Sequence, residues 1–282
     1  MTFADRLADA VRRTGTPLCV GIDPWPERLP GRGAGAEPTL HELAALSRRF
    51  GLAVVEAARG LVPAVKPQFA FFEAMGPAGM HALADVCAAA RDAGLLVVGD
   101  AKRGDIGSTA SAYAAATLAP SAPFPCDALT VSPFLGPDTL EPFVGAARAH
   151  GRGLFVLLRT SNPGSARWQA PVVDDLTAWI AAQNAGDGGY GPVGAVVGAT
   201  HDEGLVLRAR LPHTWLLVPG FGAQGGSAAA ARTMLDGEGL GALINSSRAA
   251  TFPATADPRF DADPATWIRA RVHATIAELA AG

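Results

Sequence analysis

Eight short apolar runs recur along the chain, and each is bounded by glycine, proline or charged residues. The runs are almost continuously apolar and rich in Val, Leu and Ile, which is typical of strands that are buried on both faces. They lie at residues 18–23, 64–68, 95–102, 128–133, 153–160, 194–200, 214–220 and 241–247.

Alanine-rich stretches with helical spacing separate these runs. Strand and helix patterns that alternate in this way predict parallel βα units, and eight such units close most naturally into a (β/α)8 barrel. We therefore expect one α/β domain over residues 1–282, a (β/α)8 TIM barrel, with a doubly wound open sheet as the alternative. The helical stretches lie at 41–59, 79–93, 108–119, 139–150, 173–184, 226–235 and 264–280.

Residues 24–38 depart from the alternation, because they are too rich in proline and glycine for regular structure. They predict a long loop after the first strand. Within it, Gly31-Arg32-Gly33 resembles part of a dinucleotide-binding fingerprint, but it lies well beyond the strand and has no third glycine in register. We therefore expect an insertion here and no dinucleotide site.

Composition and charge exclude several classes of protein. The chain has 282 residues, of which 49% are hydrophobic and 17% charged, so it is too apolar to be disordered or fibrous. A net charge of −3 leaves no bulk basic field for nucleic acid or an anionic membrane surface. The apolar runs are far shorter than the roughly 20 residues of a spanning helix, and the N-terminus has no apolar signal core. We expect a soluble, cytoplasmic protein without nucleic-acid or membrane partners.

The cysteines and histidines do not point to a metal site. Cys19, Cys87 and Cys126 are far apart, odd in number and form no CxxC pair, so we expect small buried hydrophobes. The six histidines make no HExxH or HxH pattern. We expect neither a disulfide nor a bound metal.

Charged residues stand at the ends of several predicted strands, where a (β/α)8 barrel carries its active site. Asp100 and Lys102 are two residues apart in a strand, so their side chains point to the same side. Together with Asp23 and Lys66 they sum to zero charge. Charges that are partly cut off from water must neutralise one another, so a structural ion-pair network and a catalytic array both remain open.

A glycine-rich segment at 220–226 follows the seventh strand, and Ser247 and Arg248 follow the eighth. The loops after these two strands are the usual phosphate site of this fold. Gly222 and Gly225 would leave backbone N–H groups accessible to an anion, and Arg248 would add a charged donor. A glycine turn beside a solvated arginine is the alternative. A phosphate site here would place the reacting end of a small phosphorylated molecule near strands two and three.

Residues 100–109 read DAKRGDIGST, which resembles the DxKxxDI signature of the orotidine 5′-phosphate decarboxylase family. The DAKRGDIG form resembles the longer-chain branch found in mycobacteria and related bacteria. Other barrel decarboxylases share an isolated DxKxxD, but here an ordered set of matches runs along the chain. The further matches are Asp23, Lys66, residues 160–164 (TSNPG), residues 219–222 (PGFG) and Arg248.

The resemblance implies a homodimeric, cofactor-independent enzyme that converts orotidine 5′-monophosphate (OMP) to uridine 5′-monophosphate (UMP) and CO2, the last step of de novo UMP synthesis. Lys66, Asp100, Lys102 and Asp105 match the family's alternating Lys-Asp-Lys-Asp array. Lys102 would protonate C6 of the pyrimidine, and Asp100 would lie beside the substrate carboxylate. Asp105 and Thr109 would complete the site across the dimer interface.

The resemblance also implies how the rest of the substrate is held. Asp23 and Lys66 would contact the ribose hydroxyls, and Ser161 would hold the pyrimidine edge. Gln224 and Arg248 would bind the 5′-phosphate.

Two alternatives remain open. A related barrel decarboxylase or aldolase, acting on a sugar phosphate such as 3-keto-gulonate 6-phosphate, would use Mg²⁺. Asp23, Asp100 and Asp105 could supply oxygen ligands, but the second strand ends in Lys66-Pro67-Gln68, without a further glutamate. A non-catalytic nucleotide-phosphate binding protein would keep the segment 220–226 and Arg248 but would have no need for Lys102. Ser132 and Thr200, at other strand ends, are expected to be structural.

Overall fold

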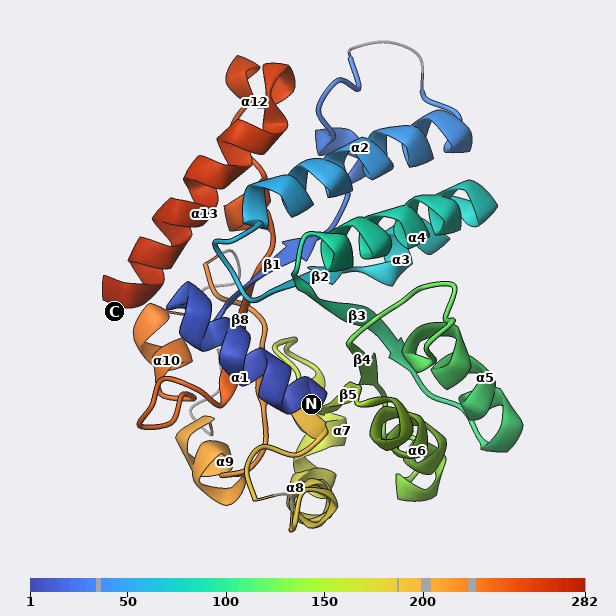
Figure 1. Cartoon of the computed structure of the whole chain (residues 1–282), viewed down its shortest axis with the longest axis vertical. Helices are drawn as coiled ribbons and strands as arrows, with labels where there is room; N and C mark the ends of the chain where they lie inside the picture. Colours follow the sequence, from blue (N-terminus) through green and yellow to red (C-terminus); the bar gives the residue numbers. More distant parts are fainter. Residues whose placement is uncertain (34–36, 187, 199–203, 223–226, 282) are drawn as a thin grey trace.

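Strands β1 to β8 pair in parallel, each with the next along the chain, and β8 pairs with β1, so the sheet closes into a barrel (Figure 1). This confirms the (β/α)8 prediction and excludes the open sheet. The strands are β1 (Leu18–Ile22), β2 (Ala64–Pro67), β3 (Leu96–Arg103), β4 (Ala128–Val131), β5 (Gly153–Arg159), β6 (Val193–Val197), β7 (Leu216–Val218) and β8 (Ala242–Ser246). The computed structural model describes residues 1–33, 37–186, 188–198, 204–222 and 227–281.

Helices connect the strands and cover the outside of the barrel (Figure 1). The stretches predicted to be helical contain helices, although the one at 226–235 holds only the short α10. The helices are α1 (Phe3–Thr14), α2 (Leu40–Ala58), α3 (Phe69–Glu73), α4 (Gly76–Asp92), α5 (Gly107–Leu118), α6 (Glu141–His150), α7 (Ser165–Gln169), α8 (Val173–Gln183), α9 (Gly204–Arg210), α10 (Ala228–Arg232), α11 (Arg248–Thr251), α12 (Pro258–Ala262) and α13 (Pro264–Ala281).

Helix α1, which is not among the predicted elements, lies across the N-terminal end of the barrel (Figure 1). A capping box begins it, because the Thr2 hydroxyl accepts the Asp5 N–H (3.2 Å) and the Asp5 carboxylate accepts the Thr2 N–H (3.0 Å). Phe3 packs edge-on against Phe155 of β5, with ring centroids 6.0 Å apart. The helix therefore closes one end of the barrel and leaves the C-terminal end for a site.

Buried apolar side chains form two clusters. One lies between the strands and the outer helices. The other fills the barrel beneath α1 and includes Leu96, Val98, Phe155 and Trp215. Because this interior is packed with apolar groups, charged chemistry is confined to the open end. The three cysteines are buried, as expected, and their thiols are free.

The described part of the 24–38 insertion is irregular, as predicted, apart from the 3₁₀ turn η1 (Pro26–Arg28). The guanidinium of Arg28 lies over the ring of Phe252, 5.1 Å from its centroid, and donates to the carbonyl of Pro253. These contacts attach the insertion to the segment between α11 and α12.

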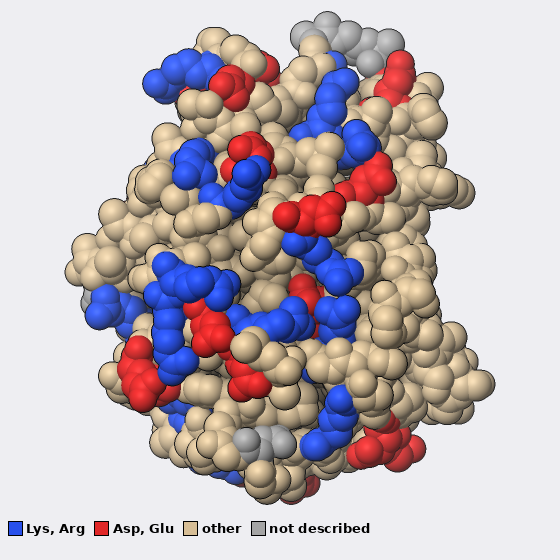
Figure 2. Space-filling view, viewed as in Figure 1, with Lys and Arg blue, Asp and Glu red and all other residues tan. Residues whose placement is uncertain are grey.

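The surface carries charges of both signs. On the face in Figure 2, Lys and Arg are interspersed with Asp and Glu, which fits the net charge of −3. Ion pairs such as Arg12–Glu238 (3.1 Å) and Arg48–Asp85 (2.5 Å) are part of this mixture. In the part of the chain that the structure describes, no helix is long and apolar enough to cross a membrane.

Candidate active site

A cavity of about 460 Å³ opens at the C-terminal end of the barrel, and all eight strands or their following loops contribute to its wall. This position confirms that the polar strand ends meet at one place. Of the predicted site residues, the cavity is lined by Asp23, Lys66, Asp100, Lys102, Ser161, Ser247 and Arg248.

Asp100 lies at the centre of the charged array. Its Oδ2 is 2.6 Å from Lys66 Nζ, and its Oδ1 is 2.6 Å from Lys102 Nζ. Gln68 Nε2 donates to Oδ2 at 2.9 Å, and the Thr130 hydroxyl lies 3.1 Å from Oδ1. The Lys66 side chain is only 5% exposed, whereas that of Lys102 is 46% exposed, so Lys102 is the ammonium that reaches the open cavity.

The electrostatics hold this array ionised at neutral pH. Burial favours the protonated form of Asp100, but Lys66 and Lys102 outweigh it and hold the pKa of this carboxyl well below its usual range. Burial also disfavours the charged form of Lys66, but Asp100 and Asp23 outweigh it and raise the pKa of this amine above its usual value. The network therefore places one carboxylate between two lysine side chains.

The pKa of Asp23, directly after β1, is shifted in the opposite direction to that of Asp100. Burial raises its pKa above the usual value, and Lys66 together with a hydrogen bond from Ser247 offsets only part of that effect. Its Oδ1 is buried and accepts no hydrogen bond from any described residue. A buried carboxylate oxygen of this kind can accept a hydrogen bond from a ligand hydroxyl.

Thr130 of β4 fixes the backbone at Lys102. Lys102 has φ 47°, in the left-handed region that residues other than glycine rarely adopt. The Thr130 hydroxyl accepts the N–H groups of Ala101 (3.0 Å) and Lys102 (2.9 Å), and the β3–β4 register shifts between Gly99 and Arg103. The prediction that the side chains of Asp100 and Lys102 point to the same side is confirmed, because both line the cavity and their charged groups are 2.6 Å apart.

Sequence reasoning missed Gln68 and Thr130. Gln68 stands two residues after Lys66, so the period of a strand was the signal that could have found it. Strand alternation from Ser132 could have suggested an inward Thr130, but its place beside Lys102 depends on the register of β4 against β3.

The loop after β5 forms another wall of the cavity and includes Ser161. Gln169 of α7 holds this loop, because its Oε1 accepts the Thr160 N–H (2.8 Å) and its Nε2 donates to the Thr160 hydroxyl (2.8 Å). Thr160 in turn donates to Asn162 Oδ1 at 2.6 Å. These bonds place a polar edge opposite the charged strands.

The structure describes part of the predicted phosphate site, which follows β7 and β8. Gly222 has φ 82°, and a Cβ there would lie 3.2 Å from the Cβ of Ala249, so the position favours glycine. Ser247 and Arg248, at the start of α11, line the cavity. Gln224, Gly225 and Thr200 lie outside the described residues.

Asp105 and Thr109 do not line the cavity of their own chain. Asp105 is half-buried and accepts the N–H of Ile106 at 2.7 Å, and Thr109 is exposed on α5. Three of the predicted Lys-Asp-Lys-Asp charges are thus assembled within one chain, and the fourth lies outside. Ser132 does not line the cavity either, and its N–H donates to the carbonyl of Arg103 at 2.7 Å.

Comparisons with known proteins identify the family of this chain. The profile of the orotidine 5′-phosphate decarboxylase / HUMPS family matches residues 16–259. Orotidine 5′-phosphate decarboxylase of Rhodopirellula baltica is 49% identical over 268 residues, covering 89% of each chain, and that of Streptomyces coelicolor is 47% identical over 236 residues, covering 80% of this chain and 81% of the relative.

Solved structures extend the likeness to the whole fold. One from Streptomyces avermitilis superposes with a TM-score of 0.78 at 39% identity, covering 98% of this chain and 96% of the other. OMP decarboxylase of Leishmania donovani superposes with a TM-score of 0.76 at 34% identity, covering 100% of this chain and 98% of the other. The chain belongs to the orotidine 5′-phosphate decarboxylase / HUMPS family.

Proposed function

We propose that this protein decarboxylates OMP to UMP and CO2, the last step of UMP synthesis, and that Asp100 and Lys102 carry the chemistry. Family membership supports the reaction. The observation that carries the assignment of residues is the contact of Asp100 with two ammonium groups, each at 2.6 Å, in the cavity wall.

The reaction demands electrostatic stabilisation at one carbon atom. Loss of CO2 from C6 leaves a carbanion whose electron pair lies in the ring plane, where no ring carbonyl conjugates with it directly. An ammonium group aimed at C6 favours this developing anion over the ground-state carboxylate. Lys102 then transfers a proton from Nζ to C6, which gives UMP, and the neutral amine regains a proton from solvent.

Asp100 contributes through its charge and its position. Because Lys66 and Lys102 keep it ionised, a substrate carboxylate beside it meets like-charge repulsion that disappears when CO2 leaves. Gln68 and Thr130 hold the same carboxylate and restrict its movement. Lys66, which is almost fully buried, holds the Asp100 carboxylate in place and keeps it ionised. It also offers an N–H to the ribose.

The remaining cavity residues bind the nucleotide. The buried Oδ1 of Asp23 accepts a ribose hydroxyl, which would satisfy an atom that has no described partner in the chain. Ser161 contacts the pyrimidine edge, and Ser247 and Arg248, with Gln224, hold the 5′-phosphate. Binding energy gained at the phosphate can help close the loops and exclude water from C6.

We further propose a homodimer in which Asp105 and Thr109 enter the cavity of the partner subunit. Neither residue lines its own cavity, although Asp105 belongs to the same signature as Asp100 and Lys102. Ile106, the next residue along the chain, is 64% exposed, and Phe134, in the loop after β4, is 80% exposed. Large apolar side chains with this much exposure are typical of a surface that another chain covers.

We also place the protein in the cytoplasm. Cys19, Cys87 and Cys126 are buried, unpaired thiols, and burial raises the pKa of Cys19 to about 12. Thiols that remain unpaired suit a reducing compartment.

The donor set does not favour the Mg²⁺-dependent alternative. Both oxygens of Asp100 are engaged by lysine ammonium groups, which repel a divalent cation. Among the described residues, no group of three His, Cys, Asp or Glu side chains could hold a metal ion.

The direct test is CO2 release from carboxyl-labelled OMP by the purified protein, with and without EDTA. The proposal expects CO2 and UMP in equal amounts and no effect of EDTA. Absence of CO2 would contradict the function, and activity abolished by EDTA would favour the Mg²⁺-dependent relative.

A further inference from the structure

Trp25 stands at the start of the 24–38 insertion, directly after Asp23-Pro24. The guanidinium of Arg248 lies over its ring, with Cζ 5.3 Å from the centroid. The same ring packs against Phe71 of α3, with centroids 5.9 Å apart and planes 40° apart. Trp25 therefore lies between the loops that follow β8 and β2, although it does not itself line the cavity.

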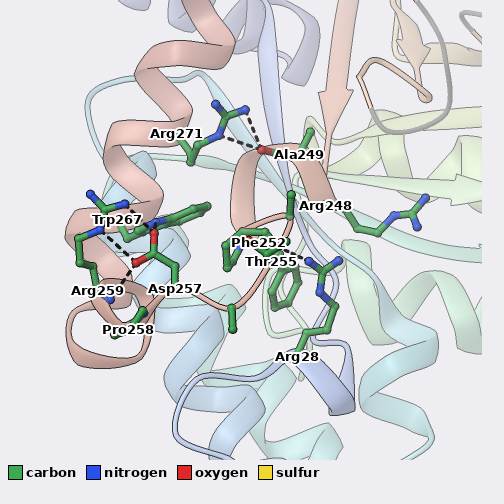
Figure 3. Close-up of a pocket in the computed structure, with 13 residues that line it drawn as sticks. Arg28, Arg248, Ala249, Phe252, Thr255, Asp257, Pro258, Arg259, Trp267 and Arg271 are labelled. Atoms are coloured by element: carbon green, nitrogen blue, oxygen red, sulfur yellow. Dashed lines mark hydrogen bonds and ion pairs between the residues drawn. The ribbon is translucent and has the colours of Figure 1, made fainter.

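Arg248 differs from the neighbouring arginines in its lack of a polar partner among the described residues. Besides the cavity, it lines a wider hollow of about 790 Å³ outside the barrel (Figure 3), where its side chain points away from the other labelled arginines. Those arginines have partners of their own. Arg271 donates to the carbonyl of Ala249, Arg28 donates to the carbonyl of Pro253, and Arg259 pairs with Asp257.

The guanidinium of Arg248 has no hydrogen bond or ion pair with any residue in the described ranges, so the contact that orients it there is the face of Trp25. Stacking occupies the face of a guanidinium and leaves its N–H groups, which lie in the plane, available to a ligand. A salt bridge would instead consume the donors that an anion needs. The contact thus orders the side chain and preserves its capacity for bidentate binding.

We propose that Trp25 is a positioning residue that presents Arg248 to the phosphate of the bound nucleotide. This inference rests on the proposed role of Arg248. It gives the insertion a function, because the first residues after β1 support the phosphate arginine that follows the neighbouring strand β8.

The backbone around Trp25 is itself fixed. Its N–H donates to the carbonyl of Asp23 (2.9 Å), and its carbonyl accepts the N–H of Arg28 (3.0 Å). One short segment therefore supports both the carboxylate proposed for the ribose and the arginine proposed for the phosphate.

The test compares the dissociation constants of UMP and uridine, measured by calorimetry, because uridine lacks the phosphate. In Trp25→Leu, which keeps apolar volume but has no ring face, the constant for UMP should rise roughly three- to tenfold and that for uridine should not change. Trp25→Phe should restore most of the UMP affinity. Trp179→Leu, which replaces another half-buried tryptophan on α8, remote from the cavity, should leave both constants unchanged.

A second comparison separates positioning from packing. Arg248→Ala should weaken UMP binding, and adding Trp25→Leu to it should weaken UMP no further, because the two residues act through one contact. Equal loss of UMP and uridine affinity in Trp25→Leu, no loss at all, or a full additional loss in the double variant would overturn the proposal. Since these are binding measurements, they remain decisive even if the protein released no CO2 from OMP.

Discussion

The hydroxyl of Thr130 lies 2.9 Å from the backbone nitrogen of Lys102 and 3.1 Å from the carboxylate of Asp100. It accepts the N–H of Lys102, whose φ of 47° is unfavourable for a lysine, and so helps to hold this backbone in place. One side chain on β4 thus positions both residues that we propose for the chemistry. Its loss would misplace the ammonium relative to C6.

Replacing Thr130 by valine, which has nearly the same shape, should lower kcat by about tenfold or more and leave UMP affinity nearly unchanged, because small misplacements of reacting groups are costly. Thr130→Ser keeps the hydroxyl and should retain most of the activity. Thr177→Val is the matched control, since the buried Thr177 hydroxyl donates within α8, to the carbonyl of Val173 (2.6 Å). Steady-state kinetics and thermal unfolding would check this, and a Thr130→Val enzyme with unchanged kcat would refute it.

Asp100 and Asp23 should influence the pH dependence of stability with opposite signs. The folded-state pKa of Asp100 is lowered, so between that value and the unfolded value near 3.8 the unfolded chain binds more protons. Its contribution to stability is present above the unfolded pKa and is lost as pH falls through the folded one. The folded-state pKa of Asp23 is raised, so its contribution is complete below about 3.8 and is lost as pH rises through the raised value.

Urea unfolding of Asp100→Asn and Asp23→Asn from pH 2.5 to 7 would test these signs. The Asn variant at position 100 should show a shallower loss of stability below about pH 3.8, by up to about 1.4 kcal/mol per pH unit. The variant at position 23 should show a steeper gain of stability with pH above about 3.8. Parallel curves for the wild type and both variants would contradict the assigned electrostatics.

The shared-site dimer predicts complementation between two inactive variants. Lys102→Ala and Asp105→Ala should each be nearly inactive alone. After mixing and subunit exchange, a heterodimer has one cavity with both residues intact, so about a quarter of all sites should regain activity in a random mixture. Exchange confirmed by mass spectrometry without recovered turnover would contradict the placement of Asp105 across the interface.

The sequence predicted the barrel and the charged strand ends because both follow from periodic patterns. Asp100 and Lys102 stand two residues apart, and the rule that a barrel concentrates polar groups at the C-terminal ends of its strands placed Asp23, Lys66 and Arg248 in the same cavity. These inferences needed only local spacing and fold class.

Contacts between distant segments could not be predicted in this way. The position of Thr130 beside Lys102 depends on the register of β4 against β3, including its shift after Gly99. The stacking of Arg248 on Trp25 joins the segments that follow the last and the first strand of the barrel. Nothing in the composition of the 24–38 insertion signals this contact. The same limit applies to Asp105, whose proposed site lies in another molecule.

The most direct test of the account is Lys102→Ala, measured for both kcat and UMP affinity. Asp100 would keep Lys66, Gln68 and Thr130 as partners, so the fold should persist. Because the Lys102 ammonium is proposed to act mainly in the transition state, kcat for OMP should fall by roughly 10³-fold or more while the dissociation constant of UMP changes by less than about threefold. A Lys102→Ala enzyme that decarboxylates OMP within about tenfold of the wild-type kcat would contradict the account.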